Sequence, residues 1–285
     1  MASLLEVGDG KPYSLVQAAI NAGDSGTTVR VCAKAASANQ YPEALTVNNK
    51  RITLEGDLPE CAIAITGAGS GAAQALFVTG TGGVTVRNLY FSNLGSSATY
   101  VVEGNIAEDW FHDSIIDGGN LAKCLQAQFL TNMTLINGLA ALDASCPGQV
   151  VAIHITAYHH SLYGLKGNNP MAEFQACLAA DCNALGFQGG LPQYCAWNVS
   201  DDLTAPGVVS FIRGLPISQM KFTGADYRLL PTTAAWFPGI SPLMTDRLAN
   251  RRMRRGPNAR IVAGAFDPWP DSPRFLTGAS SIRRW

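Results

Sequence analysis

One short segment of the chain concentrates side chains that cleave or bind carbohydrates. It combines four acids with a histidine and a tryptophan: Glu108, Asp109, Trp110, His112, Asp113 and Asp117. A protonated and an ionised carboxyl group can together hydrolyse a glycosidic bond. In a catalytic interpretation, the acids of this site are Glu108, Asp109 and Asp113.

The same segment also has a structural interpretation. In the catalytic one, Trp110, His112 and Asp117 bind the carbohydrate, because an indole ring can stack on a sugar. In the structural one, the segment is a turn between coils, with exposed acids and with aromatic rings packed on the flank. Acidic turns are common in folded proteins, so we favour the structural interpretation and assign no catalytic residue.

Other reactive residues lack the partners that their chemistry needs. Asp201 and Asp202 lie among Ser, Thr, Pro and Gly residues, a setting typical of Asx turns. His154, His159 and His160 are close in sequence, but no acidic or cysteine neighbour completes a metal site. We therefore expect His154 to point outward, the other two to lie in the following turn, and no metal or cofactor to bind.

The cysteines show no pattern of a metal site or a disulfide framework. Seven are scattered along the chain without CxxC spacing, at positions 32, 61, 124, 146, 177, 182 and 195. We expect mostly reduced, buried thiols. Cys177 and Cys195 are close to one repeat apart, which predicts that they stack inside the fold.

Composition excludes several classes of protein. The 285 residues are 47% hydrophobic but only 14% charged, and they include 29 glycines. This balance excludes a disordered chain and a coiled coil, and no apolar run is long enough for a transmembrane helix. The first residues lack the basic start and apolar core of a secretory signal. We expect a soluble, β-rich chain without membrane insertion.

Charge is unevenly distributed along the chain. Residues 1–212 carry 8 basic and 17 acidic side chains, a net of −9, whereas residues 213–285 carry 12 basic and 4 acidic ones, a net of +8. Aromatic residues do not interleave the arginines, so we expect no nucleic-acid partner. We expect instead an assembly interface that pairs with acidic surfaces of the body or of a neighbouring subunit. Its candidate residues are Arg247, Arg251, Arg252, Arg254, Arg255, Trp269 and Trp285.

A repeat of about 20 residues predicts the fold. Strand-like segments, each followed by Gly, Asn, Asp or Ser, begin at positions 114, 133, 152, 174 and 194. Such a period is typical of solenoids, and the leucine-rich consensus is absent. Gly and Asn suit tight turns, and alternating apolar residues suit a narrow core of stacked coils. We therefore predict an all-β, parallel β-helix.

Both ends of the chain resemble one family. The opening VGDGKPYSLVQAAI, residues 7–20, and the segment 29–56 resemble the cap helix and first coil of pectin-lyase-like right-handed β-helix proteins. Residues 226–235 and 245–267 resemble their closing segments, and residues 194–205 resemble β-helix proteins of phages and environmental bacteria. The resemblance implies a right-handed helix. The motifs of pectin methylesterases and polygalacturonases are absent. Residues 254–260 resemble the arginine segment of pectate lyases but lie beyond the predicted coils, so no enzymatic branch is matched residue by residue.

These observations predict three regions and two classes of function. Residues 1–24 form an amphipathic cap, residues 25–212 form the coils, and residues 213–285 form a capping region with an extended basic arm. We expect a non-catalytic structural or adhesion protein. A bacteriophage virion component fits best, such as a tail, fibre or decoration subunit, made in the host cytoplasm and trimeric by analogy. Its partners would be other virion proteins and surface glycans. The alternative is a lyase or hydrolase acting on acidic polysaccharides.

Overall fold

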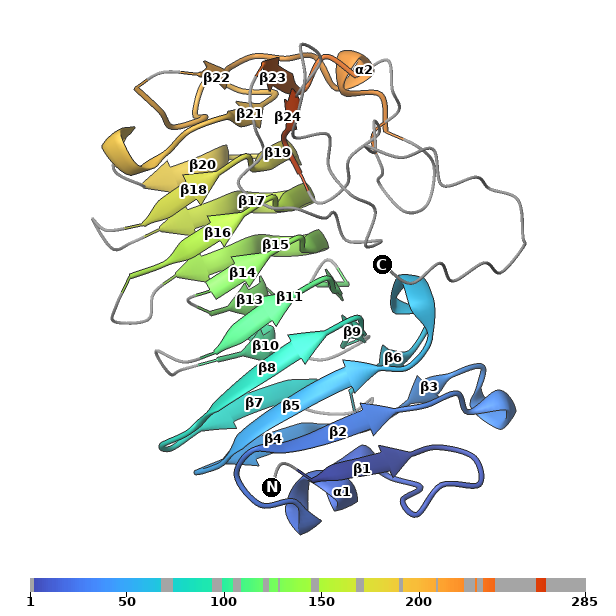
Figure 1. Cartoon of the computed structure of the whole chain (residues 1–285). Helices are drawn as coiled ribbons and strands as arrows, with labels where there is room; N and C mark the ends of the chain where they lie inside the picture. Colours follow the sequence, from blue (N-terminus) through green and yellow to red (C-terminus); the bar gives the residue numbers. More distant parts are fainter. Residues whose placement is uncertain are drawn as a thin grey trace, which may run out of the picture.

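The chain forms a parallel β-solenoid of about seven turns, with 52% of the described residues in strands (Figure 1). The predicted β-helix is therefore confirmed. The computed structural model describes residues 3–67, 74–93, 99–104, 109–119, 123–127, 129–144, 149–167, 172–189, 192–208, 210–222, 229, 233–238 and 260–264. Glu108, Cys146 and all seven predicted assembly residues lie outside this part of the chain.

Two sheets run the length of the solenoid. The first, sheet A, contains in spatial order β1 (Leu4–Val7), β2 (Thr27–Val31), β5 (Arg51–Gly56), β8 (Gly83–Arg87), β11 (Trp110–His112), β14 (Phe129–Thr131), β16 (Val151–Ile153) and β18 (Glu173–Gln175). The second, sheet B, contains along its main path β3 (Gln40–Tyr41), β6 (Ala64–Ile65), β9 (Tyr90–Ser92), β12 (Ile115–Asp117), β15 (Thr134–Ala144), β17 (Thr156–Gly167), β19 (Leu178–Cys182), β21 (Asn198–Ser200) and β22 (Phe211–Ile212).

Sheet B has a second row of strands. This row contains β4 (Leu45–Asn48), β7 (Leu76–Thr79), β10 (Tyr100–Glu103), β13 (Lys123–Gln126) and β20 (Leu185–Gly189). It merges with the main path through the long strands β15 and β17, because β13 pairs with β15 and β20 pairs with β17. The remaining elements are α1 (Val16–Ala22), α2 (Ile217–Met220), three short 3-10 turns and an antiparallel pair, β23 (Trp236–Pro238) with β24 (Arg260–Val262).

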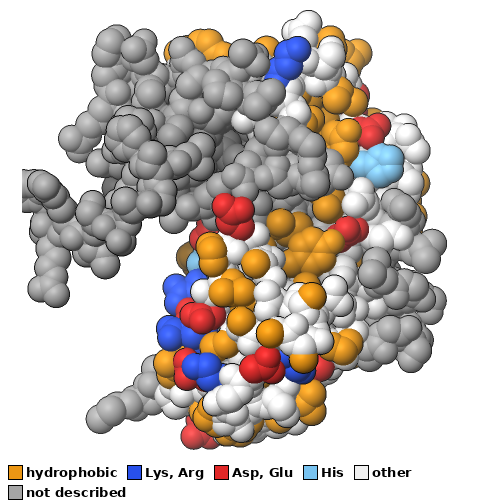
Figure 2. Space-filling model, turned by 90° about the vertical axis from the view of Figure 1, so that its right-hand side faces the viewer, with side chains coloured by type: hydrophobic (Ala, Val, Ile, Leu, Met, Phe, Trp, Pro, Cys, Tyr) orange, Lys and Arg blue, Asp and Glu red, His pale blue; other side chains and the backbone are white. Residues whose placement is uncertain are grey.

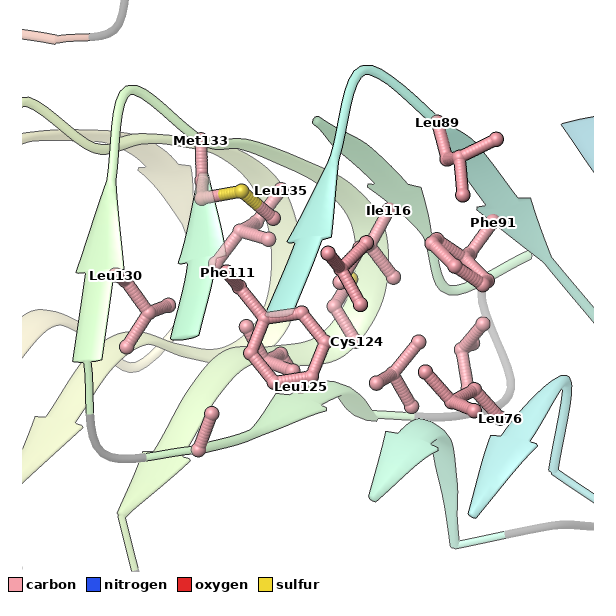
Figure 3. Packing of buried hydrophobic residues seen from close by; sticks show 14 of the residues in the cluster. Leu76, Leu89, Phe91, Phe111, Ile116, Cys124, Leu125, Leu130, Met133 and Leu135 are labelled. Atoms are coloured by element: carbon pink, nitrogen blue, oxygen red, sulfur yellow. The ribbon is translucent and has the colours of Figure 1, made fainter. Parts of the chain in front are cut away.

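The core is a ladder of apolar side chains, one from each coil. Along the middle of sheet A, Val86, Phe111 and Leu130 are in register, and each is buried. Figure 3 shows Phe111 and Leu130 pointing into the same core as Leu125 from the opposite wall. Because burial of one such side chain contributes about 1.5–3 kcal/mol, successive coils stabilise one another by stacking.

From β8 to β19, a two-residue turn whose first residue is left-handed joins each sheet A strand to the next sheet B strand. Asn88, Asp113 and Asn132 occupy this position, with φ between 51° and 55°. Their backbone N–H groups donate to the coil above, as in Asn88 to Asp113 O. Asn and Asp tolerate this conformation better than most residues, which explains their recurrence at the turn.

The N-terminal cap forms as the sequence predicts. Val16, Ala19 and Ile20 of α1 are buried against the first coil, whereas the neighbouring Leu15 is 50% exposed. Leu15 precedes the helix in an extended conformation, so it does not share the helical periodicity. The carboxylate of Glu43 accepts the first two N–H groups of the helix, each at 2.9 Å.

The six described cysteines are free thiols, and all but the half-buried Cys182 are buried. This agrees with the prediction of reduced, buried residues. Among the residues that the structure describes, no helix is long and apolar enough to cross a lipid bilayer.

Candidate functional site

The outer face of sheet A carries two columns of side chains. The first column contains five residues that are in register on consecutive coils: Thr28, Thr53, Thr85, Trp110 and Phe129. Trp110 is 53% exposed, and its ring stacks on Phe129 with centroids 5.3 Å apart and an interplanar angle of 26°. The flat strand backbone therefore presents an aromatic shelf, which we define as Trp110 and Phe129.

The second column is a ladder of alternating charges. Glu6, Arg30, Glu55 and Arg87 follow one another in register, and His112 continues the column. Glu55 is buried and accepts hydrogen bonds from Arg30 Nε and Arg87 Nε, both at 2.8 Å. In Figure 2 the Lys and Arg side chains gather mainly over the N-terminal coils, which contain this ladder. Glu55 pairs with the arginines of both neighbouring coils, so the centre of this column stabilises the fold.

Burial and pairing oppose each other at Glu55. Burial alone would raise the pKa of its carboxyl group, but the hydrogen bonds from Arg30 and Arg87 outweigh burial and hold the pKa below its usual value. Glu55 is therefore ionised in the folded protein at neutral pH.

The residues of the predicted carbohydrate cluster separate from one another. Asp109 is fully buried, and its carboxylate accepts the backbone N–H of Val84 at 2.9 Å. Such a position fits a structural role and gives a substrate no access. Trp110 and His112 both lie on the outer face of β11, where the shelf begins.

The last two acids of the cluster lie on different elements. Asp113 occupies the left-handed turn, and its carboxylate binds His112 Nδ1 at 2.9 Å and Asn132 Nδ2 at 3.0 Å. Asp117 lies beyond that turn on sheet B, where Tyr90 Oη donates to it at 2.8 Å. The described members of the cluster therefore do not form one pair of exposed carboxylates.

Sheet B brings together Asp117, His159 and Asp201, which the sequence reasoning treated separately, with Asn137 and Asp181, which it missed. The five residues lie on successive coils within one position of register, and we call them the polar row: Asp117, Asn137, His159, Asp181 and Asp201. The amide of Asn137 donates to Asp117 Oδ2 at 3.3 Å, and the N–H of Asp181 donates to Asp201 Oδ2 at 2.8 Å. Spacings of 20, 22, 22 and 20 residues match the repeat, and this was the available signal.

The centre of the polar row is an exposed histidine–aspartate pair. His159 Nδ1 lies 2.7 Å from Asp181 Oδ2, and the two side chains are 56% and 40% exposed. Both residues have positive φ, at 59° and 56°, where the chain bends between the two parts of sheet B. They border a cavity of about 70 Å³, whose lining residues are His159, His160, Ser161, Asp181 and Asn183.

Two of the three clustered histidines are buried, which corrects the expectation of surface residues. His154 occupies the left-handed turn, but the C-terminal segment covers it, and its Nδ1 lies 3.1 Å from Gly264 O. His160 lies within β17 rather than in a turn, and it is 2% exposed. Its Nδ1 accepts Gly138 N–H at 3.2 Å, and its Nε2 donates to Leu135 O at 3.1 Å. Burial lowers the pKa of His160 to about 4.

Asp201 and Asp202 have different environments. Asp202 Oδ1 accepts the N–H and hydroxyl of Thr204, as the predicted Asx turn requires, and Oδ2 accepts Gly186 N–H at 2.6 Å. Burial would raise the pKa of Asp202, but these hydrogen bonds outweigh it and lower the pKa. Burial raises the pKa of Asp201, which instead supports the polar row through Asp181.

No protein-family model matches this sequence, and no curated protein matches it. The described surface offers two candidate functional sites: the aromatic shelf of sheet A and the polar row of sheet B. The shelf offers apolar, planar contact without a reactive group of its own. The polar row offers an oriented imidazole beside a small cavity. Within the part of the chain that the structure describes, no cluster of three or more His, Cys, Asp or Glu residues could hold a metal ion.

Proposed function

We propose that this protein is a structural or adhesion β-helix whose sheet A face binds carbohydrate through the aromatic shelf. The observation that carries the proposal is the exposed ring of Trp110, stacked on Phe129 in the middle of a strand face. Pyranose rings present an apolar C–H surface, which packs on an aromatic plane while the hydroxyl groups stay hydrated. A regular strand face suits an extended glycan, because its columns repeat with each coil.

The environment of the predicted acids supports binding over cleavage at this face. Hydrolysis requires two carboxyl groups that flank the same bond. Asp109 is buried, and Asp113 and Asp117 are hydrogen-bonded on either side of a turn. A lyase or hydrolase of acidic polysaccharides remains the alternative that the binding experiment below distinguishes.

A bacteriophage virion is the setting that we propose for this adhesin. The proposal rests on the resemblance of both chain ends to pectin-lyase-like β-helices and to β-helix proteins of phages, and on the basic C-terminal region. Opposite charges on residues 1–212 and 213–285 would favour contact between copies, by analogy a trimer. Sedimentation equilibrium tests this directly: a mass three times 30.1 kDa supports a trimer, and the chain mass alone contradicts it.

Binding to a panel of acidic and neutral polysaccharides tests the proposed adhesion. We expect at least one glycan to bind, and Trp110→Ala to weaken that binding about tenfold or more, since an aromatic contact is worth about 1–3 kcal/mol. The matched control is Tyr194→Ala, because Tyr194 is 50% exposed but lies outside the sheet A columns.

Two results would contradict the proposal. If Trp110→Ala and Tyr194→Ala bind equally well, the shelf is not the binding surface. If new reducing ends or unsaturated uronates appear, the protein is a polysaccharide-cleaving enzyme rather than a simple adhesin.

A further inference from the structure

We propose that the cavity between β17 and β19 is a separate site, which hydrolyses small acyl esters. In this site Ser161 is the nucleophile, His159 is the general base and Asp181 is a positioning residue. The inference goes beyond glycan binding at the shelf, which lies on the other sheet, and the two proposals can fail independently.

The register of two neighbouring strands brings these residues together. His160 pairs with Cys182, and both side chains turn inward, His160 fully and Cys182 in part. Side chains alternate along a strand, so the residues on either side of each point outward. His159 and Ser161 therefore share the outer surface with Asp181 and Asn183 of the next coil, and all four line the cavity.

The hydrogen bond between His159 and Asp181 sets the chemistry of the imidazole. Nδ1 lies 2.7 Å from Asp181 Oδ2, so Nδ1 carries the proton when the ring is neutral. The lone pair is then on Nε2, where it can accept a proton from a nucleophile. The backbone N–H of Asp181 donates to Asp201 Oδ2, which fixes the backbone from which the Asp181 carboxylate extends.

The other two residues supply what an acyl transfer also needs. Ser161 is exposed and lies two positions along the same strand from His159. Asn183 presents a carboxamide, whose N–H can donate to an oxyanion. The cavity of about 70 Å³ has room for a few water-sized groups, which fits an acetyl group.

The reaction balances with water as the only co-reactant. Ser161 Oγ attacks the ester carbonyl and gives its proton to His159 Nε2, forming a C–O bond and an oxyanion. The resulting tetrahedral intermediate then collapses, which breaks its bond to the alcohol oxygen. The alcohol leaves with the proton that His159 had accepted. Water, deprotonated by His159, then attacks the acyl-serine, releasing the carboxylic acid and restoring the serine.

Turnover of p-nitrophenyl acetate by the full chain, with mass mapping after diisopropyl fluorophosphate treatment, tests the site. We expect the phosphoryl label on Ser161 and a loss of turnover of about 100-fold or more in Ser161→Ala and Asp181→Asn. Asp181→Asn should also change the pH profile, which a merely structural role would not do. Ser218→Ala, an exposed serine of α2, is the matched control and should retain full turnover.

Any of three results overturns the inference. The first is that Ser161 stays unlabelled while other residues react. The second is that Ser161→Ala keeps wild-type turnover, and the third is that Ser218→Ala loses as much turnover as Ser161→Ala. Because Ser161 is exposed, its replacement by Ala leaves the core intact, and the thermal melting temperature of the variant verifies this. Trp110→Ala should leave ester turnover unchanged, so failure at the shelf and failure at this site are distinguishable.

Discussion

Replacing the buried His160 with glutamine should remove a specific part of the acid sensitivity of the fold. His160 is neutral in the folded chain, because Nδ1 accepts Gly138 N–H and Nε2 donates to Leu135 O in a 2% exposed position. It pairs with Gly138, next to the register shift between Gly138 and Ala140 in the β15–β17 pairing. Protonation would place a second N–H against the Gly138 donor, inside the fold.

The size of the effect follows from the two pKa values. Burial lowers the pKa of His160 from 6.5 to about 4, with the exposed His159 adding to the shift and Asp117 opposing it. The unfolded chain therefore binds the proton first as the pH falls, and the free energy of unfolding decreases between pH 6.5 and pH 4. At 1.36 kcal/mol for each pKa unit, the total is about 3 kcal/mol. Above pH 6.5 the His160 side chain is neutral in both the folded and the unfolded chain, so it no longer lowers the free energy of unfolding.

Urea unfolding of the wild type and of His160→Gln between pH 4 and pH 8 measures this difference. The variant should be less stable at pH 8, by about 1–3 kcal/mol for imperfect hydrogen bonds, and its stability should fall less steeply on acidification. His160→Asn should show the same reduced slope, since it removes the same titrating group. Equal slopes in all three proteins would refute the assignment of His160 as a buried neutral base.

Two further predictions concern the stacking of coils. Phe111→Ala should lower the free energy of unfolding by about 3–5 kcal/mol, because it leaves a cavity between Val86 and Leu130 of the neighbouring coils. Urea denaturation measures this loss of stability. A loss below about 1 kcal/mol would show that the neighbouring coils close the cavity. Glu55→Gln should cost about 1–3 kcal/mol at pH 7, because it weakens the bonds from Arg30 and Arg87. Since the pKa of Glu55 is below its usual value, the wild type should lose this advantage as the pH falls through that pKa. An advantage that does not decrease on acidification would contradict the ion-pair origin.

Much of the fold could be predicted from local patterns. Apolar alternation, turn residues such as Asn88 and Asn132, and the helical spacing of Val16, Ala19 and Ile20 are properties of short segments. The repeat was found in the sequence, but its segments were not assigned to the correct one of the two sheets. The segments at 114 and 133 enter sheet B, whereas those at 152 and 174 lie on sheet A. Only a short turn separates the two sheets, so a strand pattern does not reveal which wall it forms.

The candidate site was harder to predict, because proximity along the chain was a poor guide. Asp109 and Asp113 are four residues apart, yet one enters the core and the other occupies a turn. His159 and Asp181 are 22 residues apart, yet they share a hydrogen bond. In a solenoid, residues one repeat apart are the nearest neighbours, so the period of the coil was the better guide.

Residue types and their spacing established the solenoid, its cap and its turns, because each depends on backbone preferences that act over a few residues. Tertiary stacking decided which polar groups meet, which of them face water, and which are covered. His154 illustrates the difference: the strand pattern predicted an outward side chain, whereas the residue occupies a left-handed turn and is buried by a C-terminal segment 110 residues away. Exposure is a property of the assembled coils and their caps, so the aromatic shelf and the polar row became visible only in three dimensions.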